Sequence, residues 1–182
     1  MKDKKLTRGA TSKRIWEMCV FSMLAAFMFI SKLAMEGLPN IHLVGVLTIV
    51  YTVVFRYKAL IPIYVYVFLN GVIAGFNLWW FPYLYIWTLL WGAVMLLPRK
   101  MPRALKLVAY PVLCMLHGML FGVLYAPAQA IMYGLSFSET LVWIVGGFGF
   151  DALHAGGNLA LGLLIYPLSE LLFKLSSKYV SR

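Results

Sequence analysis

Long apolar runs separated by short polar breaks dominate the chain from residue 15 onward. Continuous runs of this kind are typical of membrane-spanning helices, whereas β-barrel strands show alternating segments of about ten residues. The pattern predicts six spans, at residues 15–35, 42–55, 59–76, 83–97, 107–126 and 149–173. The second has only about 14 residues, which is short for a hydrocarbon core of about 30 Å. We therefore expect an all-α, polytopic membrane protein.

The predicted breaks differ in length and character. Residues 36–42 form a short outer loop that is partly buried, and residues 127–148 form the longest outer connection. The middle of that connection, residues 140–147, is apolar and ends in glycine, which favours a segment that dips back into the membrane. The six spans form one bundle over residues 15–174, and basic segments at 1–14 and 175–182 flank it.

Composition supports the bilayer as the solvent for most of the chain. Hydrophobic residues make up 63% of the 182 residues and charged residues only 12%, whereas about a quarter of a soluble domain is charged. Cys19 and Cys114 lie in apolar runs without a Cys/His spacing. The sequence therefore predicts neither a zinc site nor a disulfide framework, and we expect no metal and no cofactor.

Positive charge follows the positive-inside rule. Every Lys and Arg except Lys32 lies before the first predicted span, in the breaks after the second and fourth, or behind the sixth. This distribution predicts that both termini are cytoplasmic and that the protein is a multi-pass component of the cell membrane. The net charge of +10 does not indicate a nucleic-acid partner, because the basic residues do not gather beside exposed aromatic platforms.

A polar stripe opens the sixth predicted span. Asp151, His154 and Asn158 lie within about 60° of one another on a helix. A charged residue at membrane depth costs about 2.5–3.5 kcal/mol, so such residues usually face a cavity or a polar partner. The stripe is therefore either a ligand-facing surface or a packing ladder of hydrogen bonds to neighbouring helices.

Further candidates for ligand binding are expected at a similar depth. Lys32, near the outer end of the first span, either snorkels outward or pairs with Asp151 or an anionic ligand group. The other candidates are polar or aromatic: Asn40, His42, Asn70, Asn77, Trp80, Tyr83, Trp87 and Gln129. Their aromatic members either wall a pocket or anchor the chain at the lipid interface. His117, alone near mid-membrane, is interpreted as a histidine satisfied within the bundle.

Small residues form one face of the first predicted span. Ser22, Ala25 and Ala26 would let a helix approach closely. The partner is either another helix of this chain or a separate subunit. The sequence contains neither the GxxxxGK[ST] phosphate loop nor the HExxH motif, so catalysis by either route is not expected.

Three local segments give the chain a family resemblance. They are PNIHL at residues 39–43, FRYKA at residues 55–59 and DALHAGGN at residues 151–158. Together with the size and the six predicted spans, they make the chain resemble the substrate-binding S components of energy-coupling factor (ECF) transporters, which import vitamins into prokaryotes. Ser22 and Ala26 stand where that family has an Ala-x-x-x-Ala motif that contacts the coupling subunit.

The resemblance implies an outward-facing ligand pocket and docking on a membrane coupling subunit that is joined to two cytoplasmic ATPases. Toppling of the S component would then carry the ligand inward. The likeness is to the broad branch that includes carriers of cobalamin and other vitamins. The residues themselves leave two alternatives: a small intramembrane enzyme with Asp151 and His154 as an acid–base pair, and a solitary secondary carrier.

Overall fold

The computed structural model describes residues 2–180, with side chains from residue 11 onward, and that part of the chain contains helices and no strand. Its elements are α1 (Lys2–Ala34), α2 (Val44–Phe55), η1 (Arg56–Ala59), α3 (Leu60–Ala74), η2 (Leu78–Trp80), α4 (Tyr83–Leu96), α5 (Arg103–Met119), α6 (Phe121–Tyr133), α7 (Phe137–Gly162) and α8 (Ile165–Ser176), where η marks a short 3-10 helix. The all-α prediction is confirmed. The outermost residues of the predicted basic ends lie outside the described residues.

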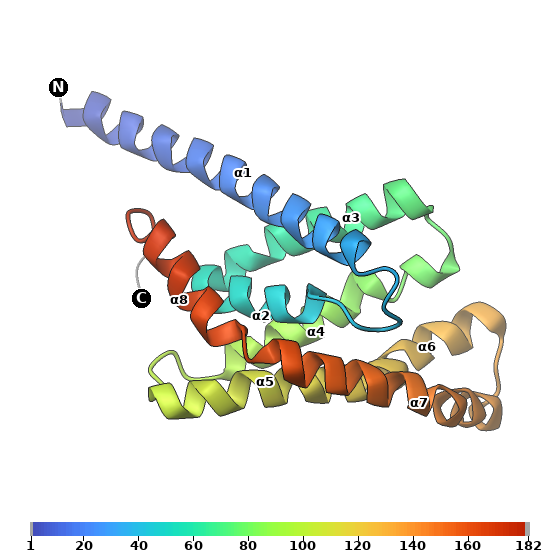
Figure 1. Ribbon diagram of the computed structural model, residues 1–182. Helices are drawn as coiled ribbons and strands as arrows, with labels where there is room; N and C mark the ends of the chain where they lie inside the picture. The colour runs from blue at the N-terminus through green and yellow to red at the C-terminus, as the bar shows by residue number, and fades with distance from the viewer. Residues whose placement is uncertain (1, 181–182) are drawn as a thin grey trace.

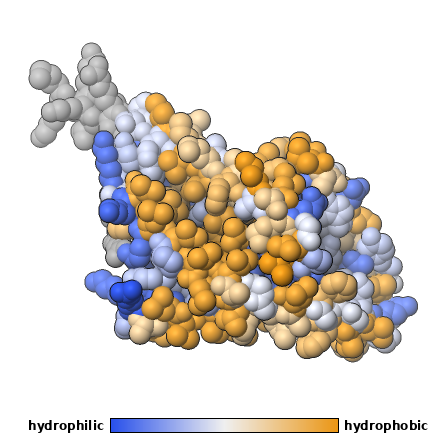
Figure 2. All heavy atoms as spheres, viewed as in Figure 1, coloured by the Kyte–Doolittle hydropathy of each residue, from blue (hydrophilic) through white to orange (hydrophobic). Residues whose placement is uncertain are grey.

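Within the described residues, three helical stretches are long and apolar enough to cross a membrane: Thr11–Ala34, Val44–Ala74 and Arg103–Tyr133. α7 and α8 together pass the same test despite a 51° bend between them, so the number of candidate spans is up to four if this bent pair is one span. Large apolar side chains cover the outside of these helices, and Figure 2 shows polar residues collecting toward the two ends of the molecule. Lipid is the solvent that suits such a surface.

The stretch Val44–Ala74 folds back on itself at η1. In one straight helix, His42 and Tyr66 would lie about 36 Å apart. Both rings nevertheless contact the indole of Trp87, at centroid separations of 6.3 Å and 6.4 Å. The reversal occurs at Arg56, whose φ of 56° lies in the region that favours glycine. α4 holds the turn: Arg56 Nη2 donates to the Met95 carbonyl and Trp91 Nε1 donates to the Arg56 carbonyl, each at 3.1 Å.

The connections gather at two ends of the molecule (Figure 1). The N- and C-termini, the η1 turn and the α4–α5 connection lie at one end, and the α1–α2, α3–α4 and α6–α7 connections lie at the other. At the first end, Lys58 Nζ lies 2.5 Å from Glu17 Oε1 and ties the η1 turn to α1. The basic residues of both turns therefore share the end that holds the termini.

α2 lies at the centre of the bundle. Every residue of this helix except Val53 is buried, and the Tyr51 hydroxyl donates to the Leu24 carbonyl of α1 at 2.9 Å. α2 has 12 residues and α4 has 14, which correspond to about 18 Å and 21 Å of helix. Each is therefore shorter than the hydrocarbon core by itself.

The prediction of a long outer connection at residues 127–148 is wrong. α6 continues to Tyr133 and α7 begins at Phe137, so the connection is confined to residues 134–136. Gly134 ends α6 with a φ of 66°. Ser136 then caps α7, since its Oγ accepts from Glu139 N at 3.3 Å while the Glu139 carboxylate accepts from Ser136 N at 2.7 Å. This reciprocal cap stabilises a helix start that the glycines at residues 146–149 obscure in the sequence.

α5 and α7 lie antiparallel and side by side (Figure 1), at a distance that glycines permit. A Cβ on Gly162 would lie 2.8 Å from Pro111 Cα, and one on Gly118 would lie 3.1 Å from backbone atoms of His154 and Ala155. Contacts this short leave no room for a side chain. This close approach holds His154 and Ala155 of α7 against Gly118 of α5.

Candidate ligand-binding site

All three histidines of the chain converge on two aromatic rings. His42 precedes α2, His117 lies on α5 and His154 lies on α7. The ring centroids of His42 and His154 are 5.0 Å apart, and His117 lies 5.6 Å from Trp87 of α4. Phe121, at the start of α6, lies 5.1 Å from His154 and 6.1 Å from Trp87. We call these five residues the histidine–aromatic cluster.

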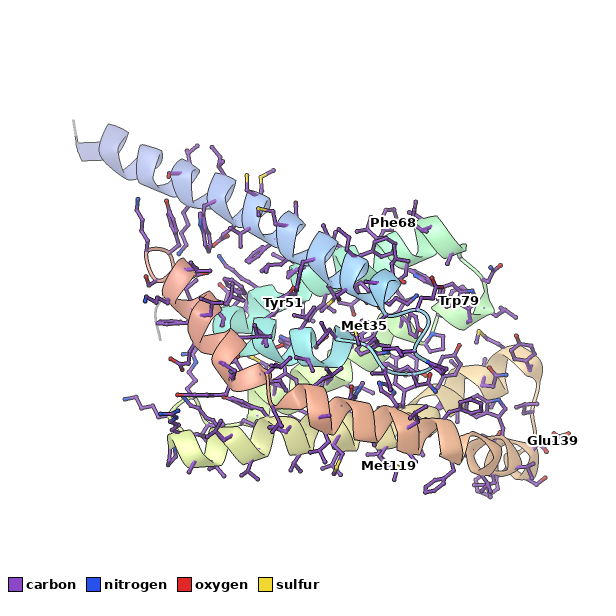
Figure 3. The ribbon with its side chains drawn as sticks, viewed as in Figure 1. Met35, Tyr51, Phe68, Trp79, Met119 and Glu139 are labelled. Atoms are coloured by element: carbon purple, nitrogen blue, oxygen red, sulfur yellow. The ribbon has the colours of Figure 1, made fainter. Side chains whose placement is uncertain are left out.

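The cluster lies toward the end of the bundle that is opposite the termini, because His42 belongs to the α1–α2 connection. In Figure 3, Met35 and Trp79 mark this end, and side chains crowd the space between α4, α6 and α7. Tyr66 and Tyr83 extend the aromatic wall, with ring centroids 6.4 Å and 6.0 Å from that of Trp87. The site is therefore built from helices that are distant in the sequence.

Several buried polar atoms of the cluster and of Asn158, one helical turn after His154, have no hydrogen-bond partner in the described part of the chain. They are His42 Nδ1, Trp87 Nε1, His117 Nδ1, His154 Nε2 and Asn158 Oδ1. The Trp87 and His154 side chains are 2% and 3% exposed. A buried polar atom without a partner costs about 1–3 kcal/mol, so such atoms are rare in native structures and usually have a specific reason. The five atoms belong to three imidazoles, one indole and one amide, so they include groups that can donate and groups that can accept a hydrogen bond.

Asn158 occupies a space that two glycines, Gly45 and Gly118, leave for it. The side chain is 1% exposed, and its Nδ2 donates to the Cys114 carbonyl at 3.0 Å. A Cβ on Gly118 would lie 2.8 Å from Nδ2, and one on Gly45 would lie 3.5 Å from it. The amide nitrogen therefore serves helix packing, and the amide oxygen is the atom that Asn158 can offer to a ligand.

Asp151 has a structural role in the bundle. Both of its carboxylate oxygens accept from the Gly122 N–H, at 3.0 Å and 3.1 Å. Gly122 lies in the first turn of α6, where N–H groups lack partners within the helix and the dipole favours an anion. Among the described contacts, no hydrogen bond joins Asp151 to His154, and this arrangement does not favour an acid–base pair.

Replacement of Asp151 distinguishes the loss of this cap from the loss of its charge. We expect Asp151→Ala to lower the free energy of unfolding by about 1–2 kcal/mol, since the first turn of α6 loses its acceptor. Asp151→Asn keeps an oxygen that accepts from Gly122, so it should lose less than half as much. Thermal unfolding of the two purified variants measures the difference. Equal losses would contradict the capping role.

Two predicted site residues lie close to His42 along the chain: Lys32 in the last turn of α1 and Asn40 on the α1–α2 connection. Lys32 is half-buried near the end of α1, close enough to His42 to act on it electrostatically. Asn40 is exposed with a φ of 56°, and its Nδ2 donates to the Phe150 carbonyl of α7 at 3.4 Å. Asn40 thus fastens this connection to α7 and helps to position His42.

The other predicted residues lie farther along the same end. Asn70 is 1% exposed, donates to the Tyr66 carbonyl at 3.1 Å and leaves its Oδ1 without a partner. Trp80 Nε1 donates to the Val67 carbonyl at 2.8 Å. Asn77 is exposed beside η2 and Gln129 is half-buried on α6. None of the described contacts brings Asn77, Trp80 or Gln129 to the histidine–aromatic cluster.

The predicted small-residue face of α1 is divided between the inside and the outside of the bundle. Ala25 is fully buried against the chain itself. Ser22 is exposed and Ala26 is half-buried. Ala25 therefore packs internally, and Ser22 and Ala26 are the two residues of this face that another subunit can reach.

Sequence reasoning missed His117 and Phe121 as members of the site. His117, Phe121 and Tyr125 follow one another at intervals of four residues, the spacing that aligns side chains on one helix face. The Phe121 and Tyr125 centroids are 6.1 Å apart, and the Tyr125 ring stacks on Trp143 of α7 at 5.8 Å. This spacing is the sequence signal that could have identified His117 and Phe121 as members of the site. His117 considered alone did not reveal it.

The cluster offers hydrogen bonds and ring faces. Among the described residues, no group of three His, Cys, Asp or Glu side chains is placed to hold a metal ion. No protein-family model, curated protein or solved structure matches the chain.

Proposed function

We propose that this chain is the membrane-embedded, substrate-binding subunit of an ECF-type importer, and that the histidine–aromatic cluster binds its ligand. The observation that supports this most strongly is the set of unpartnered buried atoms at His42, Trp87, His117, His154 and Asn158. Neutral imidazoles can each donate and accept, an indole donates, and an amide oxygen accepts. Aromatic faces beside them favour a small, planar, polar compound, as many vitamins and related micronutrients are.

The proposal includes six crossings with both termini in the cytoplasm. The termini share an end with the basic turns, while the connections at the opposite end carry no Lys or Arg. α2 is too short to cross alone but is surrounded by protein, and non-helical backbone at membrane depth is tolerated when protein buries it. Residues 35–43 would complete the second crossing in this way.

Energy for import would come from partner subunits. The chain carries no GxxxxGK[ST] phosphate loop, so we assign ATP hydrolysis to two cytoplasmic ATPases that act through a membrane coupling subunit. Ser22 and Ala26 on the accessible face of α1 would contact that subunit. Small side chains there allow close helix packing.

Isolation of the tagged, full-length chain from its native membranes tests the assembly. We expect a membrane subunit and two ATPases to co-purify with the wild type, and to be lost with Ser22→Trp because the indole separates the helices. Val145→Trp, on the exposed face of α7, is the matched control and should retain the partners. Uptake of the ligand in cells that lack every such ATPase would instead indicate a solitary carrier.

A further inference from the structure

A cavity of about 430 Å³ lies at the end of the bundle that holds the termini. It is therefore at the opposite end from the histidine–aromatic cluster, between the η1 turn, the α4–α5 connection and α8. The volume falls within the range of about 300–1,000 Å³ that is usual for small-molecule pockets. Of the side chains that the structure describes, four basic ones line it: Arg56, Arg99, Lys100 and Lys106.

The charge of the cavity is strongly positive. Among the described residues, Glu170 is the single acidic residue that lines it. The guanidinium groups of Arg56 and Arg99 are close enough to repel each other. Like charges gathered at one place are stabilised by a bound anion, which is the ligand that this arrangement favours.

Arg56 has an uncommon backbone conformation. Its backbone adopts a φ of 56°, and a conformation of this type costs a non-glycine residue about 1–3 kcal/mol. Its Nη2 donates to the Met95 carbonyl, whereas its Nε is buried without a partner. A glycine would suit the turn better, so the guanidinium is the reason to have an arginine at this position.

Ser169 supplies an independent sign of a polar ligand. It lines the cavity from α8, is 4% exposed, and its Oγ has no hydrogen-bond partner among the residues that the structure describes. Tyr110, 5% exposed on α5, lines the cavity nearby. Hydroxyl donors combined with guanidinium and ammonium groups are the donor set that binds phosphate oxygens. Val54, Val94 and Phe173 form an apolar wall beside them.

We propose that this cavity binds a phosphate group, carried either by an anionic lipid head group or by free phosphate. Basic pockets between membrane helices on the cytoplasmic side are suited to lipid head groups, and the apolar wall would accept the glycerol and the first acyl carbons. Arg99, Lys106 and Ser169 would contact the phosphate oxygens. The proposal is independent of the ligand bound at the opposite end.

Calorimetric titration of the purified full-length chain in a neutral detergent tests this site. The probes are dihexanoyl phosphatidate, inorganic phosphate and, as a neutral head group, dihexanoyl phosphatidylcholine. Removal of two charged contacts by Arg99→Gln with Lys106→Gln should weaken binding of the preferred probe by roughly tenfold or more. Lys174→Gln with Lys178→Gln removes the same charge from side chains outside the lining, and should change the affinity less than about twofold.

The outcomes separate the sources of the phosphate. Saturable binding of phosphatidate that inorganic phosphate displaces only in large excess indicates a lipid head group, while similar affinities for both indicate free phosphate. Ser169→Ala, which keeps every charge, should weaken either by about three- to tenfold. If no anionic probe saturates, if phosphatidylcholine binds as well as phosphatidate, or if both double variants weaken binding equally, the proposal is wrong.

Discussion

His154→Ala is expected to weaken ligand binding on the order of 100-fold, since the ligand loses a hydrogen bond and a ring contact that together contribute about 2–3 kcal/mol. His154 is 3% exposed, and its Nε2 has no hydrogen-bond partner among the described residues. The folded protein therefore loses packing but no hydrogen bond at this atom. Melting temperatures recorded against a concentration series of vitamins and nucleobase analogues measure the change, because a ligand that binds the folded state raises the melting temperature.

Leu153→Ala is the matched control for this prediction. Leu153 is 44% exposed on the same helix, and its truncation should leave the affinity within about twofold. If His154→Ala bound the ligand as tightly as the wild type, His154 would have no role in binding. If it failed to fold while Leu153→Ala folded, the imidazole would be a packing residue, and the polar stripe of α7 would be a ladder between helices.

Gly118→Val is expected to have the largest effect on folding. A Cβ at Gly118 would lie 2.8 Å from Asn158 Nδ2 and 3.1 Å from backbone atoms of His154 and Ala155. Backbone cannot yield as a flexible side chain does, so α5 must move away from α7. Overpacking of this kind costs about 1–3 kcal/mol or more, and the loss of the bond from Asn158 to Cys114 adds to it.

The yield of monodisperse protein in size-exclusion chromatography measures that prediction. Gly118→Val should yield little folded protein, and any that survives should bind ligand poorly because His117 and His154 no longer meet the same rings. Gly156→Val is the control, since open space surrounds a Cβ at that position of α7. Equal yields from the two variants would show that the glycine contact between α5 and α7 is not required.

The helices were predicted best from the sequence where a charged or proline-containing break lies at the end of an apolar run. The predicted span at residues 83–97 corresponds to α4, and the break at residues 56–58 is the turn that ends α2. Hydrophobic periodicity and loop charge are local, so one sequence is sufficient to detect them. The helical state of residues 127–148 was missed because glycines and apolar residues mark a loop less clearly than charges do.

The site was only partly predictable, for a different reason. Helical spacing correctly groups Asp151, His154 and Asn158 on one face, but it does not show what each meets. Asp151 caps α6 and Asn158 donates a hydrogen bond to α5, as the packing interpretation of the stripe expects. Nε2 of His154, in contrast, has no hydrogen-bond partner among the described residues. The meeting of His42 with His154 depends on how the α1–α2 connection packs, and that information is tertiary.

Mass spectrometry of the small molecules released from the detergent-purified protein tests the central proposal most directly. We expect one polar, ring-bearing compound of vitamin-like size, close to one per chain in the wild type and Leu153→Ala, and strongly depleted in His154→Ala. Lipids and detergent alone, or a compound equally abundant in all three proteins, would contradict a binding subunit whose ligand lies at the histidine–aromatic cluster.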